Sequence, residues 1–205
     1  MKLTTGLCVL GVALSLAGAA AVGAGAASIT EKTTYFAVKG STLAELDQDL
    51  NRRGPFLSET GVRHPGATEV TFDGKVSYKR TSEGCEVDQT NLSLNLEITL
   101  PKWTPPKRVS PQTRLIWQTL EADIVRHENR HAAIAKNWLK RTESALRNLR
   151  PERTCREMEA MVNTVTARYL AGHERAQVEF DTIEAREVNF RLRRALYRAV
   201  QEQGR

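Results

Sequence analysis

A His-Glu-x-x-His motif runs from His127 to His131 inside a long helical pattern, and it is the stretch best suited to chemistry. Residues four apart lie on one face of a helix, so the imidazoles of His127 and His131 could reach one metal ion. Glu128 then stands beside them, where its carboxylate could act as a general base toward water. This arrangement is typical of zinc peptidases, in which a zinc-activated water attacks the peptide bond. The alternative is an exposed helical turn on which two histidines merely flank a Glu and an Arg.

The N-terminal 27 residues have the composition of a signal peptide. Lys2 supplies a positive charge, residues 7–16 are apolar, and small residues follow, with an A-x-A-type cleavage site at 24–26. We therefore expect residues 1–27 to be removed on export, leaving a single zincin-like domain at 28–205. A retained N-terminal anchor is the alternative, but the apolar stretch is short and the following residues are rich in Ala and Gly.

The charge pattern excludes some classes of partner. The chain carries a formal net charge of +6, which falls to about +5 without the leader. This positive balance could favour an acidic partner or an anionic surface. The basic residues are dispersed among acidic ones and no nucleic-acid motif is present, so we expect no nucleic-acid binding. No segment after the leader is apolar enough for a stable membrane span.

Two cysteines remain once the leader, which holds Cys8, has been removed. An even number of cysteines in an exported protein predicts a disulfide, here between Cys85 and Cys155. The bond would close a loop of about 70 residues and stabilise the fold by roughly 4 kcal/mol in the chain-entropy description. Two buried, unpaired thiols are the alternative.

The first half of the mature chain, residues 28–106, has the pattern of a small α+β unit. We expect a strand at 33–38, a helix at 43–52, strands at 67–72 and 75–80, and a strand at 90–100. Thr42 is suited to cap the helix, and Asp73-Gly74 predicts a hairpin turn between the middle strands. Pro101 is expected to close the β region.

The second half, residues 107–205, is helical by pattern. Ser110-Pro111 predicts the start of a helix reaching about residue 149, and Pro151 predicts its end. A second long helix is expected from 152 to about 202, with Gly172 marking a kink or a close approach. The predicted fold class is α+β, with a small N-terminal antiparallel sheet and a short helix, followed by a long α-helical hairpin that carries the His-Glu-x-x-His motif.

A catalytic zinc usually takes three protein ligands, and the motif supplies two. Residues 132–140 offer neither a Gly nor a His, which excludes the metzincin extension. With a turn near residue 150, a residue near 129 would face one near 171 on the second helix. There the face formed by four polar side chains, spaced four, four and three residues apart, is a candidate source: His173, Gln177, Asp181 and Glu184. His173 is nearest in this register; a solvated polar stripe is the alternative.

The mature chain resembles a bacterial family of secreted, zinc-dependent protease-like proteins catalogued as domain of unknown function 922. The resemblance rests on the order and spacing of several short pieces around the central motif. They are Tyr35-Phe36-Ala37-Val38-Lys39-Gly40, Arg53-Gly54-Pro55, Cys85, Leu100-Pro101-Lys102-Trp103, Trp117, His127-Glu128-Asn129-Arg130-His131, Cys155 and Phe180-Asp181.

The resemblance implies an exported metalloprotease-like protein in which Cys85 pairs with Cys155. Many members have an aromatic-Asp pair followed by Thr and then His-Gly. Phe180-Asp181 matches the pair, whereas Arg186-Glu187 stands at the later His-Gly position. The resemblance therefore favours Asp181 as the third ligand, with Glu184 beside it, while His173 matches no motif of the family.

The leading functional hypothesis is a periplasmic or secreted zinc metallopeptidase acting on a peptide or protein substrate. His127, His131 and Asp181 would bind Zn²⁺, and Glu128 would be the general base. The first alternative is a non-catalytic envelope protein with a structural or vestigial metal site. The second is a metal-free helical interaction module. Glu128 distinguishes the hydrolase from a structural metal site, because only the hydrolase needs it.

Overall fold

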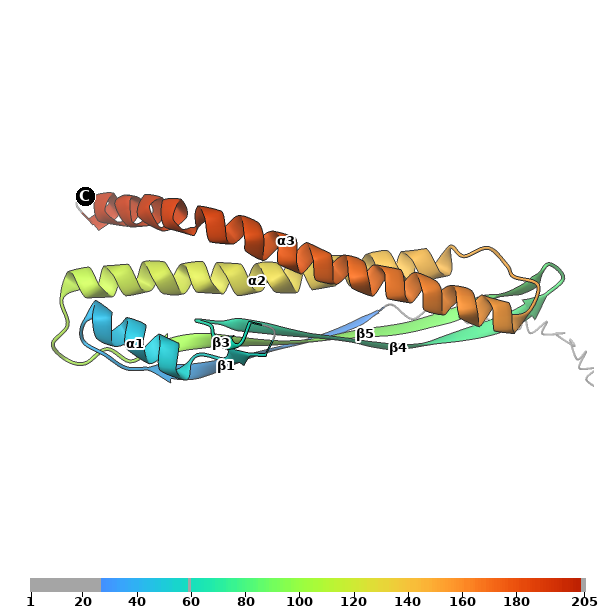
Figure 1. Cartoon of the computed structure of the whole chain (residues 1–205), viewed down its shortest axis with the longest axis horizontal. Helices are drawn as coiled ribbons and strands as arrows, with labels where there is room; N and C mark the ends of the chain where they lie inside the picture. The colour runs from blue at the N-terminus through green and yellow to red at the C-terminus, as the bar shows by residue number, and fades with distance from the viewer. Residues whose placement is uncertain (1–26, 59, 204–205) are drawn as a thin grey trace, which may run out of the picture.

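The computed structural model describes residues 27–58 and 60–203, which form an α+β fold with two long helices (Figure 1). The signal peptide expected at 1–27 lies, apart from Ala27, outside the described residues. In chain order the elements are β1 (Ser28–Val38), α1 (Leu43–Arg53), β2 (Phe56–Leu57), β3 (Val62–Arg63), β4 (Ala67–Thr81), β5 (Gly84–Trp103), α2 (Pro111–Arg147) and α3 (Cys155–Gln203). The predicted fold class is confirmed for the short helix and the two long packed helices.

The main sheet is mixed, so the expectation of an antiparallel sheet was wrong. Its strand order is β1-β5-β4, with β1 parallel to β5 and β4 antiparallel to β5. Tyr35, for example, lies opposite Leu100. A parallel pair needs a crossover connection, and here α1 and the strands that follow it supply the chain between β1 and β5.

The hairpin predicted at Asp73-Gly74 was also wrong. β4 runs straight through both residues, and the chain reverses between Thr81 and Gly84 instead. A Cβ on Gly74 would lie 2.7 Å from the side chain of Leu92 on β5, so this glycine makes room for the neighbouring strand. Gly84 has φ +134°, a conformation that residues with a Cβ rarely adopt, and it makes the reversal possible.

Pro101 does not end the sheet, because β5 continues to Trp103. Pairing of β5 with β4 extends only to Thr99, whereas β1 pairs with β5 through Pro101 and beyond. Beyond Thr99 the strand therefore has one hydrogen-bonded neighbour, a place where a residue without an N–H is tolerated.

The helix starts follow the capping signals of the sequence. Thr42 and Glu45 form a capping box on α1, and the Ser110 hydroxyl accepts from the Thr113 N–H at 3.0 Å on α2. α3 begins at Cys155, three residues later than expected. Before it, the backbone of Glu152 pairs with that of Cys85, and the Thr154 hydroxyl accepts from the Glu157 N–H at 3.2 Å. The backbone pair adjoins the predicted Cys85–Cys155 disulfide, which is formed.

The two long helices lie side by side and α2 faces the sheet (Figure 1). Leu139 of α2 belongs to a buried cluster with Leu94 and Ile98 of β5. The N-terminal half of α3 contributes Met158 to a second cluster with Leu146. Gly172 marks a close approach of α3 to α2, since a Cβ there would lie 2.5 Å from the Trp138 ring.

A third cluster joins α1, the end of β1 and the start of α2 through Leu50, Val38 and Trp117. Among the described residues, none of the three clusters includes an α3 residue beyond Tyr169. The later part of α3 contacts α2 through ion pairs, such as Arg191 with Asp123, and through Phe180, which packs against His127. No helix in 27–58 or 60–203 combines the length and apolar character needed to cross a membrane.

Candidate metal centre

Three side chains from the two long helices bring a nitrogen or oxygen atom to one point. The Nε2 atoms of His127 and His131, one turn apart on α2, lie 3.0 Å from each other. Oδ1 of Asp181 on α3 lies 3.3 Å from Nε2 of His127 and 3.0 Å from Nε2 of His131. This triangle forms a group that could hold a metal ion.

The outer nitrogens of the two imidazoles have different partners. Nδ1 of His131 lies 2.7 Å from Oε1 of Gln177 on α3, a hydrogen-bond distance. Nδ1 of His127 faces the carboxylate of Glu184, also on α3, at 3.6 Å. Both Nε2 atoms therefore point toward Asp181 while both Nδ1 atoms are occupied from α3, which orients the rings as metal ligands require.

Glu184 belongs to a charged cluster that joins the helices beside the histidines. Arg191 donates to both oxygens of Asp123, at 2.6 and 3.0 Å, and also lies 2.9 Å from Glu184. Arg126 bonds both Asp123 and Glu184. The two arginines hold the pKa of Glu184 below its ordinary value despite burial, so it remains a charged partner for His127.

Phe180 packs against both imidazoles and limits their freedom. Its ring centroid lies 5.0 Å from that of His127 and 4.9 Å from that of His131. The side chains of these histidines are 28% and 14% exposed, whereas that of Asp181 is 54% exposed. The group is thus closed by Phe180 on one side and open to solvent along Asp181.

Burial lowers the pKa of His127, and the neighbouring His131 lowers it further. The carboxylates of Asp181 and Glu184 act in the opposite direction without reversing the shift. A neutral imidazole is the form that binds a metal. The environment of His127 therefore favours its ligand form at neutral pH.

Glu128 lies on the sheet-facing side of α2, where it is only 5% exposed. Oε2 accepts a hydrogen bond of 2.8 Å from the Thr68 hydroxyl at the start of β4. Burial raises the pKa of this carboxyl, and the charge of Asp181 adds to the rise, although Thr68 and His131 oppose it. A buried carboxylate with one side-chain donor is costly for a purely structural role and is well suited to proton transfer.

Gly66 leaves space beside the second oxygen of Glu128. A Cβ on Gly66 would lie 2.8 Å from Oε1 of Glu128 and 2.9 Å from Cγ2 of Ile124. The loop before β4 therefore approaches this carboxylate more closely than any residue larger than glycine allows.

The donor set fits a zinc ion better than calcium or magnesium. Two imidazole nitrogens and one carboxylate oxygen are ligands that zinc takes in catalytic sites, whereas calcium and magnesium prefer oxygen alone. Atoms bound to one zinc ion at 2.0–2.1 Å lie about 3.3 Å apart at the corners of a tetrahedron. The separations of 3.0–3.3 Å in this group are close to that value.

The three candidates for the third position lie in different places. Asp181 joins the two histidines, whereas Glu184 faces the outer nitrogen of His127. His173, which the simple helix register favoured, contacts Gln177 and packs edge-on against Phe72 of β4, with ring centroids 4.9 Å apart. Gln177 had no individual role predicted from the sequence, although the four-four-three spacing places it on this face.

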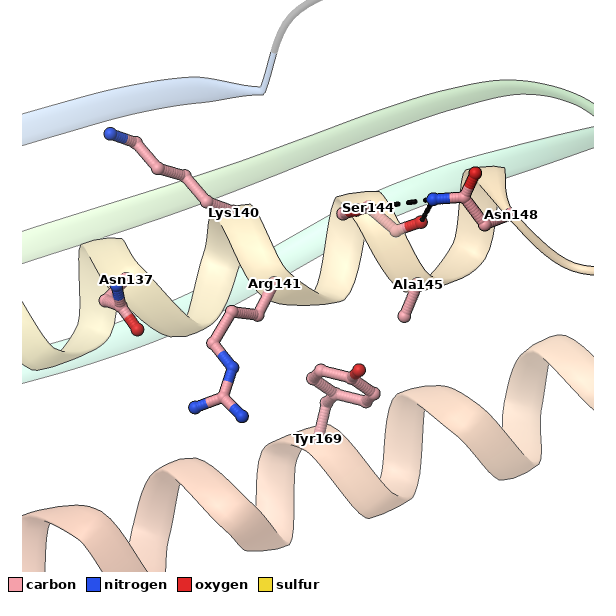
Figure 2. A pocket seen from close by; sticks show the side chains of 7 residues that line it. All are labelled: Asn137, Lys140, Arg141, Ser144, Ala145, Asn148 and Tyr169. Carbon is pink, nitrogen blue, oxygen red and sulfur yellow. Dashed lines mark hydrogen bonds between the residues drawn. The ribbon is translucent and has the colours of Figure 1, made fainter.

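A shallow hollow between α2 and α3 lies away from this group. Figure 2 shows that Tyr169 of α3 faces side chains on the α2 turns that follow the histidines. The lining is Asn137, Lys140, Arg141, Ser144, Ala145, Asn148 and Tyr169. It contains none of the metal-group residues and no carboxylate.

The family resemblance seen in the sequence is confirmed for the family itself. The family described as "Bacterial protein of unknown function (DUF922)" matches residues 33–187, which include every residue of the metal group, Glu128 and both bonded cysteines. No curated protein and no solved structure matches the chain. The match covers well over half of the sequence, and the chain belongs to this bacterial family.

Proposed function

We propose that the protein is an exported zinc metallopeptidase that hydrolyses peptide bonds. The observation that carries the proposal is the meeting of His127, His131 and Asp181, together with the buried carboxylate of Glu128, the residue that follows His127 in the sequence. A structural metal site has no need of that carboxylate, whereas a hydrolase needs a base at this place. The disulfide supports an extracytoplasmic location, because such bonds persist in oxidising compartments.

In this proposal each residue has a separate role. His127, His131 and Asp181 would hold the zinc ion, and Gln177 and Glu184 would orient the two imidazoles. Bound zinc would polarise the scissile carbonyl and make water more acidic. Glu128 would accept the proton of the attacking water at its carboxylate and return it to the leaving amine. Its raised pKa brings that carboxylate closer to the value that suits proton transfer at neutral pH.

The deciding experiment combines metal analysis with peptide hydrolysis on the full chain, exported by a bacterial host so that the disulfide forms. We expect about one zinc per chain and cleavage of an unstructured protein substrate such as casein. The chelator phenanthroline should abolish cleavage and added zinc should restore it. Chain that contains zinc but cleaves neither casein nor a peptide library would contradict the peptidase assignment.

One observation favours a second function, a non-catalytic envelope protein with a structural metal. In the described part of the chain, the apolar clusters end at Tyr169 on α3, so a metal held by Asp181 would fasten the later half of that helix to α2. Glu128→Gln separates the two functions. A structural site would leave the metal-dependent rise in melting temperature unchanged and show no hydrolysis to lose.

A further inference from the structure

Gln177 and His173 of α3 lie behind the His131 ring, on the side away from Asp181. The role inferred for them rests on the proposed metal site. Gln177 of α3 makes three contacts. Its Oε1 lies 2.7 Å from Nδ1 of His131, and its Nε2 lies 3.3 Å from the His131 carbonyl oxygen and 2.9 Å from Nε2 of His173.

The carbonyl contact fixes how the amide is oriented. A backbone carbonyl oxygen can only accept a hydrogen bond, so the NH₂ group of Gln177 must face it. Oε1 of Gln177 is therefore the atom that faces His131, and because Oε1 can only accept, Nδ1 of His131 carries a proton. A neutral His131 then keeps its free lone pair on Nε2, the atom that faces Asp181 and His127.

The same logic fixes the tautomer of His173. The Gln177 NH₂ group can only donate, so Nε2 of His173 accepts and the proton of a neutral His173 lies on Nδ1. The His173 ring in turn packs edge-on against Phe72 of β4. A chain of contacts thus runs from the sheet through Phe72, His173 and Gln177 to His131.

We propose that Gln177 is a positioning residue that locks His131 in the tautomer with a free Nε2, and that His173 and Phe72 hold Gln177 in place. The partner of His127 is different, since a carboxylate, Glu184, faces its Nδ1 at 3.6 Å. Residues that hydrogen-bond a metal-binding imidazole from behind typically change metal affinity by about 10–100-fold when they are removed. The hydrogen bond between Gln177 and His131 therefore predicts a loss of metal affinity of this size when Gln177 is removed.

The test compares three variants of the full chain. Gln177→Leu removes both polar groups at similar volume, and Gln177→Glu keeps an acceptor for the Nδ1 proton but not the donor. Gln201→Leu is the matched control, because Gln201 is an exposed amide near the C-terminal end of the same helix. Zinc affinity is measured by competition with a fluorescent chelator, and the metal-free proteins are melted in parallel.

We expect zinc affinity to fall by about 10–100-fold in Gln177→Leu and to stay within about threefold of the original in Gln177→Glu. Gln201→Leu should change nothing. Unchanged affinity in Gln177→Leu would overturn the inference. Equal losses in the Leu and Glu variants, matched by equal drops in the melting temperature of the metal-free proteins, would also overturn it, because packing would then explain the effect.

A second measurement separates this inference from the metal assignment. The ¹⁵N shifts of His131 in the metal-free chain report which ring nitrogen carries the proton. We expect a protonated Nδ1 in the original protein at a pH where the ring is neutral. In Gln177→Leu we expect a shift toward the tautomer protonated on Nε2, because Oδ1 of Asp181 lies 3.0 Å from that atom and can only accept. A neutral His131 protonated on Nε2 would refute the positioning role. Failure of the original chain to bind zinc would refute the proposed function while leaving the tautomer result intact.

Discussion

Asp181 of α3 and His131 of α2 meet across the interface of the two long helices, with Oδ1 of the aspartate 3.0 Å from Nε2 of the imidazole. Because the residues lie 50 positions apart, their contact depends on how the helices are aligned. That alignment follows from the connection, in which Glu152 pairs with Cys85 and α3 begins only at Cys155. The disulfide and the metal group are therefore linked through the register of one helix.

Asp181→Ala should reduce zinc affinity more than Glu184→Ala. Asp181 places an oxygen within 3.3 Å of both Nε2 atoms, whereas Glu184 lies behind His127. Loss of Glu184 should cost about 10–100-fold, as for other residues behind a ligand, and loss of Asp181 should exceed this. Isothermal titration of metal-free protein with zinc measures both. The reverse order would move the third ligand to Glu184.

Glu128→Gln should keep zinc and lose hydrolysis. The substitution preserves the size of the side chain and removes a base worth about 100-fold or more in rate. Stoichiometric zinc in the variant is the control, because Glu128 is not one of the group that could hold the metal. If the variant cleaves peptides at the original rate, the proposed base is wrong.

Local signals in the sequence predicted the helices well. The Ser110 cap and the spacing of apolar residues predicted α2 to within two residues of its observed end. The sheet was harder, because strand partners are set by contacts between distant residues. Asp73-Gly74 has the composition of a turn, but the absence of a side chain at Gly74 leaves room for the side chain of Leu92 on β5. The parallel pairing of β1 with β5 likewise leaves no local signal.

In the metal group, too, contacts within one helix were easier to predict from the sequence than contacts between the two helices. The four-residue spacing of His127 and His131 predicted their approach directly, because both lie on one helix. The residue opposite His131 depends on where α3 starts. With the turn placed near residue 150, the expected partner lay about two helical turns before Gln177, which is why His173 seemed nearest. The family pair Phe180-Asp181 pointed to the carboxylate that lies beside the two histidines, which helix geometry alone did not single out.

Removal of the disulfide should lower stability by roughly 4 kcal/mol, since it closes a loop of about 70 residues. The double substitution Cys85→Ser, Cys155→Ser is compared with the original protein by urea denaturation. The backbone pair between Cys85 and Glu152, with hydrogen bonds of 2.7 and 2.9 Å, remains available in the variant. Thiol labelling of denatured original chain should find neither Cys85 nor Cys155 reactive; labelling of both would contradict the bond.

Asp49 of α1 should make the free energy of unfolding depend on pH in the acidic range. Its buried carboxylate accepts from Arg52, from the Lys39 N–H at 2.8 Å and from Arg53 at 3.0 Å. The hydrogen bond from Arg52 is the largest cause that lowers its pKa from 3.8 to about 2.

Because the folded pKa lies below the unfolded value, Asp49 stabilises the fold above pH 3.8, and this contribution is lost as the pH falls through about 2. Asp49→Asn should therefore be less stable than the original at pH 7 and approach it in stability at pH 2. Denaturation curves at pH 7, 3 and 2 measure the difference. Asp47→Asn, an exposed change on the same helix, is the control and should show no such convergence.

Gly66→Ala should impair hydrolysis while leaving zinc in place. The new methyl group would lie 2.8 Å from Oε1 of Glu128 and 2.9 Å from Ile124, so the carboxylate must move away from the loop. Thr68→Val tests the same carboxylate from its other side by removing the hydroxyl that donates to Oε2 at 2.8 Å. Neither residue belongs to the group that could hold the metal, so zinc content should stay near that of the original chain.

The expected signature of both variants is a lower kcat with little change in KM, because a displaced base slows the chemical step more than substrate binding. Thr68→Val should also move the acidic limb of the pH–rate profile to higher pH. The hydrogen bond from Thr68 lowers the pKa of Glu128, so its loss raises that pKa. Full activity in Gly66→Ala, together with an unmoved pH profile in Thr68→Val, would show that proton transfer does not pass through Glu128.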